Sequence, residues 1–468
     1  MVLVNSAGNS NYAYPEQPGT LATATDANGN LILGGRVIIV GSYDINTNSV
    51  ASYSNRAGNI CHTLAANGSC ADKYRISDFY ILAPGNAFTA SKTGDLYNIQ
   101  TGTSQAAAVV SGSVAVINQM WPYMKGENIV KLLMTTANKN LAGYNPEVHG
   151  QGLLDLEKAT RPVGTMTIPT TGRTGVVAVN GSFATNTSGG LSSLSSKLSS
   201  VVVLDSFGRD YRMNLAQNAS AKVARVDFNP ITKANYFSDY NPYSRLNTYT
   251  YSGSARTGDY DVKADLNGYT NGAQFEMGKT TKYSDNTNVR LGMGFLTEHN
   301  AWMGNSVGGM FGEVGQSYTQ FFNFTGNHRL NKNVTVFGSA WVGQTTADMT
   351  STGLVTNIGS TQSYSWNVGA DYTHEGHSFG ATVSQPVTVY KGSVDVTLPV
   401  AMSAEGVVQY SKERVSISPD VHEYDFGAYY KYKTASLGLI AYGEHQVNYL
   451  NQAGVTNNLV GLALNKEW

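Results

Sequence analysis

The second half of the chain alternates apolar and polar residues with a period of two, from about residue 225 to its carboxyl end. Successive side chains of a β-strand point to opposite faces, so this period predicts strands with one apolar and one polar face. Two such segments separated by a brief turn predict a hairpin. The clearest apolar rows are Tyr364, Trp366, Val368, Ala370 and Tyr372, and then Tyr424, Phe426, Ala428, Tyr430 and Tyr432, which lead to Leu437, Leu439 and Ala441.

These strands have the length and polarity of strands that cross a membrane. Segments of about nine to eleven residues with one apolar face are typical of transmembrane β-barrels, and residues 225–468 suit about twelve antiparallel strands. A water-soluble β-sandwich also alternates apolar and polar residues, but its turns recur about every 8 to 12 residues. The hairpins here are longer, which favours the barrel. The last strand ends on Trp468, which resembles the assembly signal of bacterial outer-membrane barrels. That resemblance implies contact with outer-membrane lipid and with the barrel-assembly machinery.

Composition and charge narrow the possible partners. Lysine and arginine number 31 against 32 aspartate and glutamate, so no basic excess indicates a nucleic-acid partner. Only 13% of the residues are charged, while glycine reaches 50 and tyrosine 29, a profile typical of exported β-rich proteins. No apolar run approaches the roughly 18 residues of a membrane-spanning helix. The sequence at Met1 shows no export signal, and we expect no cofactor and no metal.

The first part of the chain follows a different pattern. Val37–Val40 is predicted to be a buried strand, and Thr103–Gln119 and Glu127–Asn138 are predicted to be helices. Strands mixed with helices in this way indicate an α/β domain. A serine-rich, glycine-rich stretch follows and indicates a junction. The predicted regions are an α/β domain over residues 1–160, a junction over 161–224 and the β-barrel over 225–468.

The sequence contains two cysteines, Cys61 and Cys70, separated by a polar, glycine-containing segment. A disulfide that closes this short loop is the expected arrangement, and it would contribute on the order of 2 to 3 kcal/mol. Such a bond persists in an oxidising compartment. The alternative is a pair of buried free thiols, whereas a metal site has too few ligands here.

The most specific chemical signal is the segment Gly102–Gly112, which reads Gly-Thr-Ser-Gln-Ala-Ala-Ala-Val-Val-Ser-Gly. A serine at the start of a helix lies at its positive end, and small residues behind it let the helix pack closely. The segment resembles the nucleophile motif of the subtilisin family of serine peptidases, G-T-S-x-A-A/S-P-x-V-A/S-G. Ala108 stands where the family commonly has proline. The resemblance implies that Ser104 is the nucleophile.

Other segments resemble the same family in the same order along the chain. Val4–Ser10 is similar to its A-A-G-N segment, which implies that Asn9 donates to the oxyanion. In subtilisin, loss of that donor costs about 2.7 to 4 kcal/mol of transition-state stabilisation. The resemblance covers residues 4–159 and implies part of a subtilisin-like α/β domain. The remaining blocks are Arg36–Gly41, Ala51–Gly58, Leu82–Gly85 and Gly150–Ala159.

The catalytic aspartate and histidine of the family have no counterpart in this sequence. The family order is aspartate, histidine, asparagine and serine, yet none of the eight residues before Asn9 is an aspartate or a histidine. His62 and His149 follow Asn9, where the family places no base, and we expect them in surface loops. Asp44 and Asp155 are expected to be ordinary loop and helix-start carboxylates. The sequence therefore predicts an amino-terminally truncated peptidase domain that is inactive by itself.

These resemblances imply a serine endopeptidase that cleaves peptide or protein substrates and is displayed by an autotransporter barrel. The barrel would lie in the bacterial outer membrane, with the peptidase part at the cell surface or outside the cell. An alternative is a non-catalytic, barrel-anchored adhesin or binding protein that retains subtilase remnants. A plain pore would leave the subtilase-like blocks unexplained.

Overall fold

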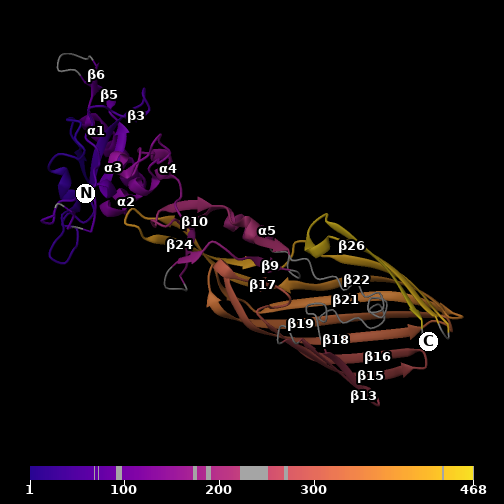
Figure 1. Ribbon diagram of the computed structural model, residues 1–468. Coiled ribbons are helices and arrows are strands. Elements are labelled where there is room, and N and C mark those ends of the chain that lie inside the picture. The colour runs from indigo at the N-terminus through magenta and orange to yellow at the C-terminus, as the bar shows by residue number, and fades with distance from the viewer. Residues whose placement is uncertain are drawn as a thin grey trace. The chain divides into compact units, whose positions relative to one another are not determined.

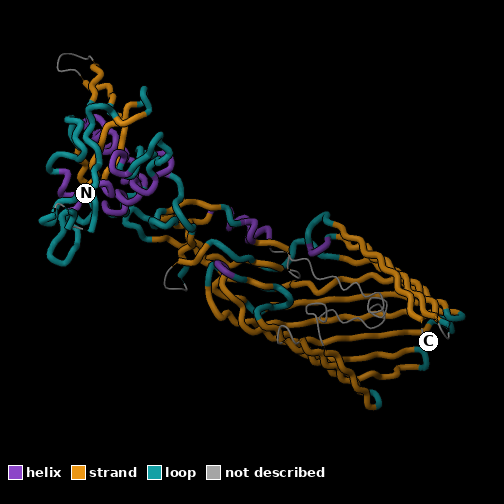
Figure 2. Tube along the Cα trace, viewed as in Figure 1, coloured by secondary structure: helices purple, strands orange, loops and turns teal. Residues whose placement is uncertain are grey.

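The computed structural model describes residues 1–67, 69–71, 73–90, 97–171, 176–185, 191–221, 251–267, 272–434 and 437–466. The described residues fall into two compact units. Unit 1 contains Met1–Met166, Leu204–Tyr211 and Ala401–Gln409, and unit 2 contains Thr167–Val203, Arg212–Val400 and Tyr410–Trp468. Helices are concentrated in unit 1, whereas long strands dominate unit 2 (Figure 2). The predicted boundary at residues 224 and 225 lies outside the described residues, as does Trp468.

Unit 1 contains a small sheet built on the predicted buried strand. β2 (Val37–Asp44) pairs in parallel with β1 (Leu3–Ser6) on one side and with β4 (Tyr80–Pro84) on the other. β3 (Ser49–Val50) pairs antiparallel with the end of β2. Because β2 is buried along nearly its whole length, it can be a continuous run of Val and Ile residues without alternation.

Helices complete the core of unit 1. α1 (Thr103–Met120), which is labelled in Figure 1, buries the stripe Ala106, Val110 and Ile117. It lies close to β1, β2 and β4. α2 (Gly126–Thr136), which overlaps the helix predicted over Glu127–Asn138, buries Ile129, Val130 and Leu133. The smaller elements of unit 1 are η1 (Gly19–Thr23), η2 (Ile76–Phe79), β5 (Asn86–Ala90), β6 (Tyr97–Thr101), α3 (Pro146–His149) and α4 (Leu156–Thr160).

The segment Leu204–Tyr211 belongs to unit 1, although it follows the first part of that unit by about 40 residues in the sequence. Its buried Arg209 makes the contacts that join it to the rest of the unit. The side chains of Arg209 and Asp205 are both fully buried and form an ion pair with a 2.7 Å N–O distance. The Arg209 guanidinium also donates to the carbonyl oxygens of Ala159 and Arg161 and lies 4.5 Å from the ring centre of Trp121. A buried charge is tolerated only when it is paired and hydrogen-bonded, and Arg209 meets both conditions.

Unit 2 contains a large antiparallel sheet, with 11 strands among the described residues. Each strand pairs with the next in the order β13, β14, β15, β16, β18, β19, β21, β22, β25, β26 and β27. Their bounds are β13 (Tyr251–Thr257), β14 (Tyr260–Asn267), β15 (Gly272–Ser284), β16 (Thr287–His299), β18 (Gly312–Arg329), β19 (Val334–Thr352), β21 (Thr361–His374), β22 (His377–Lys391), β25 (Tyr424–Lys433), β26 (Leu437–Val447) and β27 (Thr456–Lys466).

The predicted hairpin is confirmed as β25 and β26, which pair along their whole length. All neighbouring strands of the large sheet are antiparallel, as predicted. The pairing among the described residues does not join β13 to β27, so it does not close the sheet into a barrel. The sheet has 11 described strands, where about twelve were expected. Among the described residues, no helix is both long enough and apolar enough to cross a membrane.

At many positions the large sheet buries polar side chains and exposes apolar ones. Along β18, Thr319 and Asn323 are buried, whereas their neighbours Tyr318 and Phe322 are 48% and 58% exposed. On β15 the carboxylate of Glu276 is buried and forms an ion pair with Arg290 of β16, which also pairs with Asp261 of β14. On β27, Val460, Leu462 and Leu464 are exposed apolar side chains. This polarity is the reverse of that in a water-soluble sheet.

Shorter strands accompany the large sheet in the chain from residue 167 onward. In the described residues they form sheets in the orders β11-β10-β7-β8, β12-β9-β17 and β20-β23-β24. The elements are β7 (Thr167–Pro169), β8 (Val176–Ala178), β9 (Phe183–Thr185), α5 (Leu191–Lys197), η3 (Leu198–Ser200), β10 (Val201–Leu204), β11 (Asp210–Met213), η4 (Ala216–Asn218), β12 (Ala219–Ala221), β17 (Ser306–Val307), η6 (Gly309–Phe311), β20 (Val355–Ile358), β23 (Ser393–Met402), β24 (Val408–Ser416) and η7 (Tyr449–Asn451).

Candidate active site

Ser104 is the second residue of α1 and is exposed. The first backbone N–H groups of a helix have no partner within the helix, so the amide of Ser104 can donate to an oxygen outside it. Its hydroxyl lies at the positive end of an 18-residue helix, where a developing negative charge is stabilised. The predicted nucleophile therefore has the helix-start position that the sequence motif requires.

Asn9 lies against the start of α1. Its Oδ1 accepts from the backbone N–H of Thr103 at 2.9 Å and from the hydroxyl of Thr103 at 3.0 Å. A Cβ added to Gly102 would lie 3.4 Å from Asn9 Nδ2, so the amide group is also close to Gly102. Because Oδ1 is engaged by Thr103, the orientation of the amide is fixed and Nδ2 is left to donate. Asn9 itself is exposed, so a substrate oxygen can reach that donor.

Gly8 joins the loop that carries Asn9 to Thr103 at the start of α1. Its N–H donates to the Thr103 hydroxyl at 3.3 Å, and its φ of +103° is a conformation that residues with a Cβ rarely adopt. A Cβ at this position would lie 2.5 Å from Asn55 Nδ2 and 2.8 Å from the carboxyl carbon of Glu16. Glycine is therefore required at position 8 both by the backbone conformation and by the close approach of two side chains.

Asn55 is a buried residue that holds the loop around Asn9 in place, and the sequence did not single it out. Its Oδ1 accepts from the N–H groups of Ser10 and Tyr12 at 3.0 and 2.9 Å, and its Nδ2 donates to the carbonyl of Ala7 at 3.0 Å. These bonds fix the backbone on both sides of Asn9. The available signal was an amide side chain within Ala51–Gly58, a block already noted for its likeness to the subtilisin family.

The two histidines of unit 1 lie in different settings, and no hydrogen bond between either one and Ser104 is found in the described part of the chain. His62 is exposed in a loop, as expected, and its backbone N–H donates to Thr23 Oγ1. His149 was expected in a surface loop, but this expectation is wrong, because it ends α3 and is buried. Its ring folds back onto the helix start, where Nδ1 lies 3.0 Å from the N–H of Asn145.

The two aspartates have the ordinary roles that the sequence predicts. Asp44 ends β2 and accepts from the N–H of Asn46 in the following turn. Asp155 is the N-cap of α4, where its Oδ1 accepts from the N–H of Lys158 at 2.8 Å. Each carboxylate stabilises a local turn, so neither position assigns it to proton transfer.

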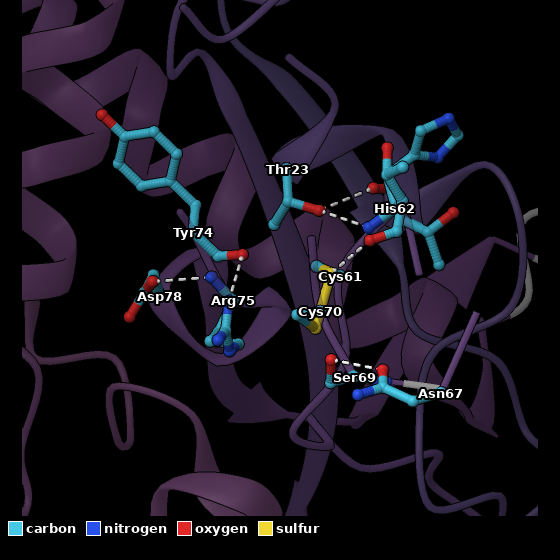
Figure 3. The surroundings of a disulfide bond; sticks show 11 residues. Thr23, Cys61, His62, Asn67, Ser69, Cys70, Tyr74, Arg75 and Asp78 are labelled. Atoms are coloured by element: carbon cyan, nitrogen blue, oxygen red, sulfur yellow. Dashed lines mark hydrogen bonds between the residues drawn. A yellow bond between two sulfur atoms is a disulfide. The ribbon is translucent and has the colours of Figure 1, made fainter. Parts of the chain in front are cut away.

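Cys61 and Cys70 form a disulfide whose Cα atoms are 5.6 Å apart (Figure 3). The bond closes a loop with a sequence separation of 9 and places Cys61 in a buried position. Next to it, Thr23 accepts from the backbone of His62, so the disulfide loop is also joined to the end of η1 (Figure 3). A disulfide of this size stabilises the fold by about 2 to 3 kcal/mol and forms in an oxidising compartment.

Comparison with known families gives a match over the residues that form this site. Residues 1–153 match the sequence model of the subtilase family, which contains serine peptidases of the S8 type. A comparison with curated proteins found no match.

Two solved structures illustrate the structural similarity. The epidermin leader peptide processing serine protease EpiP of Staphylococcus aureus is 21% identical over 35% of this chain and 42% of its own, with a TM-score of 0.23. MycP1 from Mycobacterium smegmatis is 19% identical over 35% of this chain and 42% of its own, also with a TM-score of 0.23. The chain thus spans less than half the length of these proteins, and the family match rests on the sequence of residues 1–153.

Proposed function

Residues 1–153 belong to the subtilase family, and from this premise we propose that the chain is part of a serine endopeptidase carried by an outer-membrane β-barrel. One observation carries the peptidase part of the proposal: the exposed Ser104 begins a helix beside an asparagine whose amide orientation is fixed by Thr103. This is the arrangement that acyl transfer through a serine requires. The substrates are peptides or proteins.

In the proposed reaction, Ser104 Oγ attacks the carbonyl carbon of the scissile peptide bond. The carbonyl oxygen becomes negatively charged and accepts hydrogen bonds from Asn9 Nδ2 and from the Ser104 backbone N–H. The C–N bond then breaks and leaves an acyl group on Ser104, which water hydrolyses. The proton of Ser104 must pass to a base and from the base to the leaving amine.

That base is the missing part of the site. In the described residues, no histidine is hydrogen-bonded to Ser104. The ring of His149 accepts from Asn145, and His62 is an exposed loop residue whose backbone N–H donates to Thr23. In subtilisin, loss of the catalytic base lowers turnover by about 10⁶. We therefore expect this chain by itself to bind substrate analogues but not to turn over peptides at a measurable rate.

The barrel part of the proposal rests on the reversed polarity of the large sheet. A sheet that exposes Phe322 and Leu462 while it buries Glu276, which pairs with Arg290, is stable when hydrocarbon surrounds its outer face. The proposal places unit 2 in the bacterial outer membrane, in contact with lipid and inserted by the barrel-assembly machinery. Unit 1 would then be displayed at the cell surface or released, where its disulfide is stable.

The peptidase proposal can be tested on the full chain with a peptide boronic acid. The boron atom bonds to the serine oxygen, the hydroxyl proton is released to water, and the boron becomes a tetrahedral anion that resembles the reaction intermediate. We expect binding that Ser104→Ala abolishes and that Asn9→Ala weakens by about 100-fold or more. Ser111→Ala, which removes another exposed hydroxyl of α1, is the matched control and leaves binding unchanged.

Two results would contradict the proposal. Boronate binding that survives Ser104→Ala would remove Ser104 from the reaction. Absence of binding by the folded chain would instead favour the alternative, a barrel-anchored adhesin that keeps only the remnants of a peptidase. The membrane part is tested separately by density-gradient fractionation of cells, in which we expect the chain in the outer-membrane fraction.

A further inference from the structure

Glu16 holds its carboxylate against the loop that carries Asn9. Its backbone N–H donates to the carbonyl of Ala7 at 3.0 Å, which ties residue 16 to the start of that loop. Its carboxyl group lies directly beside Gly8, so closely that a Cβ on Gly8 would be 2.8 Å from the carboxyl carbon. Gly8 in turn donates to Thr103, the residue that precedes Ser104. Glu16 is therefore separated from the candidate active site by one glycine.

Two side chains fix the Glu16 carboxylate. Ser10 Oγ donates to Glu16 Oε1 at 2.9 Å, and Asn55 Nδ2 lies 3.4 Å from the same oxygen. Asn55 is fully buried and is itself held by the backbone of the loop, so it cannot turn away. Both contacts involve Oε1 and neither supplies a positive charge. Glu16 Oε2 remains available to a donor from outside the protein.

The charge of Glu16 is not balanced within unit 1. Among the described residues, no lysine, arginine or histidine forms an ion pair with Glu16, although the residue is exposed. The cation that follows Asn55 in sequence, Arg56, donates its Nη1 to Asn11 Oδ1 instead. An oriented, unbalanced carboxylate beside a site for acyl transfer attracts a positively charged group of the substrate.

We propose that Glu16 makes the site select substrates with a lysine or arginine side chain next to the scissile bond. The proposal rests on the proposed peptidase function and deepens it, because it names the substrate class. A long basic side chain extends from a backbone held at Ser104 and Asn9, and its cationic end pairs with Glu16. Arginine gains more than lysine, since its planar group can donate two hydrogen bonds to one carboxylate.

The competing explanation is that Glu16 is only structural and holds Ser10 in place. The substitution Glu16→Gln separates the two, because glutamine keeps an acceptor oxygen for Ser10 and Asn55 but loses the charge. Glu147→Gln is the matched control, since Glu147 is another exposed carboxylate of unit 1 that lies on α3. Neither residue has been placed among the groups that contact the reacting atoms.

The experiment measures the affinity of the full chain in detergent for two peptide boronic acids of equal length. One ends in boroarginine and the other in boroleucine, so they differ only in the side chain next to the reacting boron atom. We expect the wild-type chain to bind the boroarginine compound roughly fivefold more tightly, the effect of an exposed ion pair. The ratio falls to about one in Glu16→Gln, remains in Glu147→Gln and shrinks when salt is added.

Equal affinities in the wild-type chain, or a ratio that persists in Glu16→Gln, would overturn this inference while leaving the peptidase function intact. If neither compound binds, or if binding is insensitive to Ser104→Ala, the proposed function itself fails and the inference fails with it. The two failures are distinct, because the first changes only the ratio of affinities and the second removes the Ser104-dependent binding of both compounds.

Discussion

The two units of this chain place their polar groups on opposite sides. Unit 1 buries Val37–Val40 of β2 and the stripe Ala106, Val110 and Ile117 of α1, and it exposes Ser104 and Asn9. The large sheet of unit 2 buries Thr319 and Glu276, and it exposes aromatic residues such as Tyr318 and Phe322. Both regions have regular secondary structure, so the presence of backbone pairing does not distinguish them. The difference teaches that the pattern of buried and exposed side chains is what separates the two units, and the membrane location proposed for unit 2 rests on that pattern.

The largest effect is expected for the ion pair between Arg209 and Asp205, which places charged groups in the interior of unit 1. Arg209→Met removes the partner of Asp205 and leaves a buried carboxylate without its cation, so unit 1 should lose about 3 to 5 kcal/mol of unfolding free energy. Urea unfolding followed by the fluorescence of Trp121 measures this loss. Arg161→Met, which breaks the exposed pair with Glu157, is the control and should cost less than about 1 kcal/mol. Similar losses in both variants would contradict the buried position of Arg209.

The next effect tests the reversed polarity of the sheet directly. Phe322→Arg puts a charge on the exposed face of β18, which should cost about 2 to 4 kcal/mol if lipid covers that face. The folded fraction of unit 2, measured by its resistance to unfolding in unheated gel samples, should fall accordingly. In a water-soluble sheet the same substitution at a 58% exposed position would be nearly neutral. If Phe322→Arg did not change the folded fraction, the exposed face of β18 would behave like a surface in water. The proposed difference in surroundings between the two units would then be wrong.

A smaller effect is expected at Thr103, which orients Asn9 in the exposed candidate active site of unit 1. Thr103→Val keeps the shape of the side chain but removes the hydroxyl that donates to Asn9 Oδ1 and accepts from the N–H of Gly8. The Asn9 amide then keeps only the backbone N–H of Thr103, and boronate affinity should fall by about fivefold or more, since each lost hydrogen bond contributes about 1 kcal/mol. Isothermal titration measures this change. An unchanged affinity would mean that Asn9 does not depend on Thr103 for its orientation.

The smallest effect is expected in the unfolding free energy of unit 1 at alkaline pH. Burial raises the pKa of Tyr211 to about 12, and the carboxylates of Asp205 and Asp210 act in the same direction. Burial and the hydrogen bond to Asp210 also raise the pKa of Tyr123. Because the folded-state pKa exceeds the unfolded value of about 10, this stability is fully present below pH 10. It is lost as the pH rises from 10 toward 12.

Urea unfolding at several values between pH 9 and 12 tests this behaviour. Tyr211→Phe should flatten the decline, whereas Tyr12→Phe, which changes an exposed loop tyrosine, should leave it unchanged. A decline that is equally steep without Tyr211 would assign the alkaline sensitivity to other groups.

Much of the fold could be predicted because its signals are local. A run such as Val37–Val40 is buried as β2, and the helix predicted over Thr103–Gln119 is α1 with nearly the same bounds. The period of two in the second half gives the strands and the β25–β26 hairpin. Each of these follows from the residues of the segment itself, since period and burial are properties of consecutive positions.

Contacts between distant segments could not be predicted in the same way. Nothing in Leu204–Tyr211 indicates that this segment joins unit 1, because the partners of Arg209 lie about 50 residues earlier in the chain. The burial of His149 depends on how its ring folds against α3 and Tyr144. The resemblance to subtilases pointed to Ser104 and Asn9, but the network around Asn55 and Glu16 required the folded loop.

The hydrogen bond between Asn9 and Thr103 joins positions 94 residues apart. In a fully extended polypeptide these two residues would be separated by up to about 300 Å. In an unfolded chain the Asn9 amide therefore cannot stay next to Ser104. The arrangement that we propose for acyl transfer exists only once this whole region has folded.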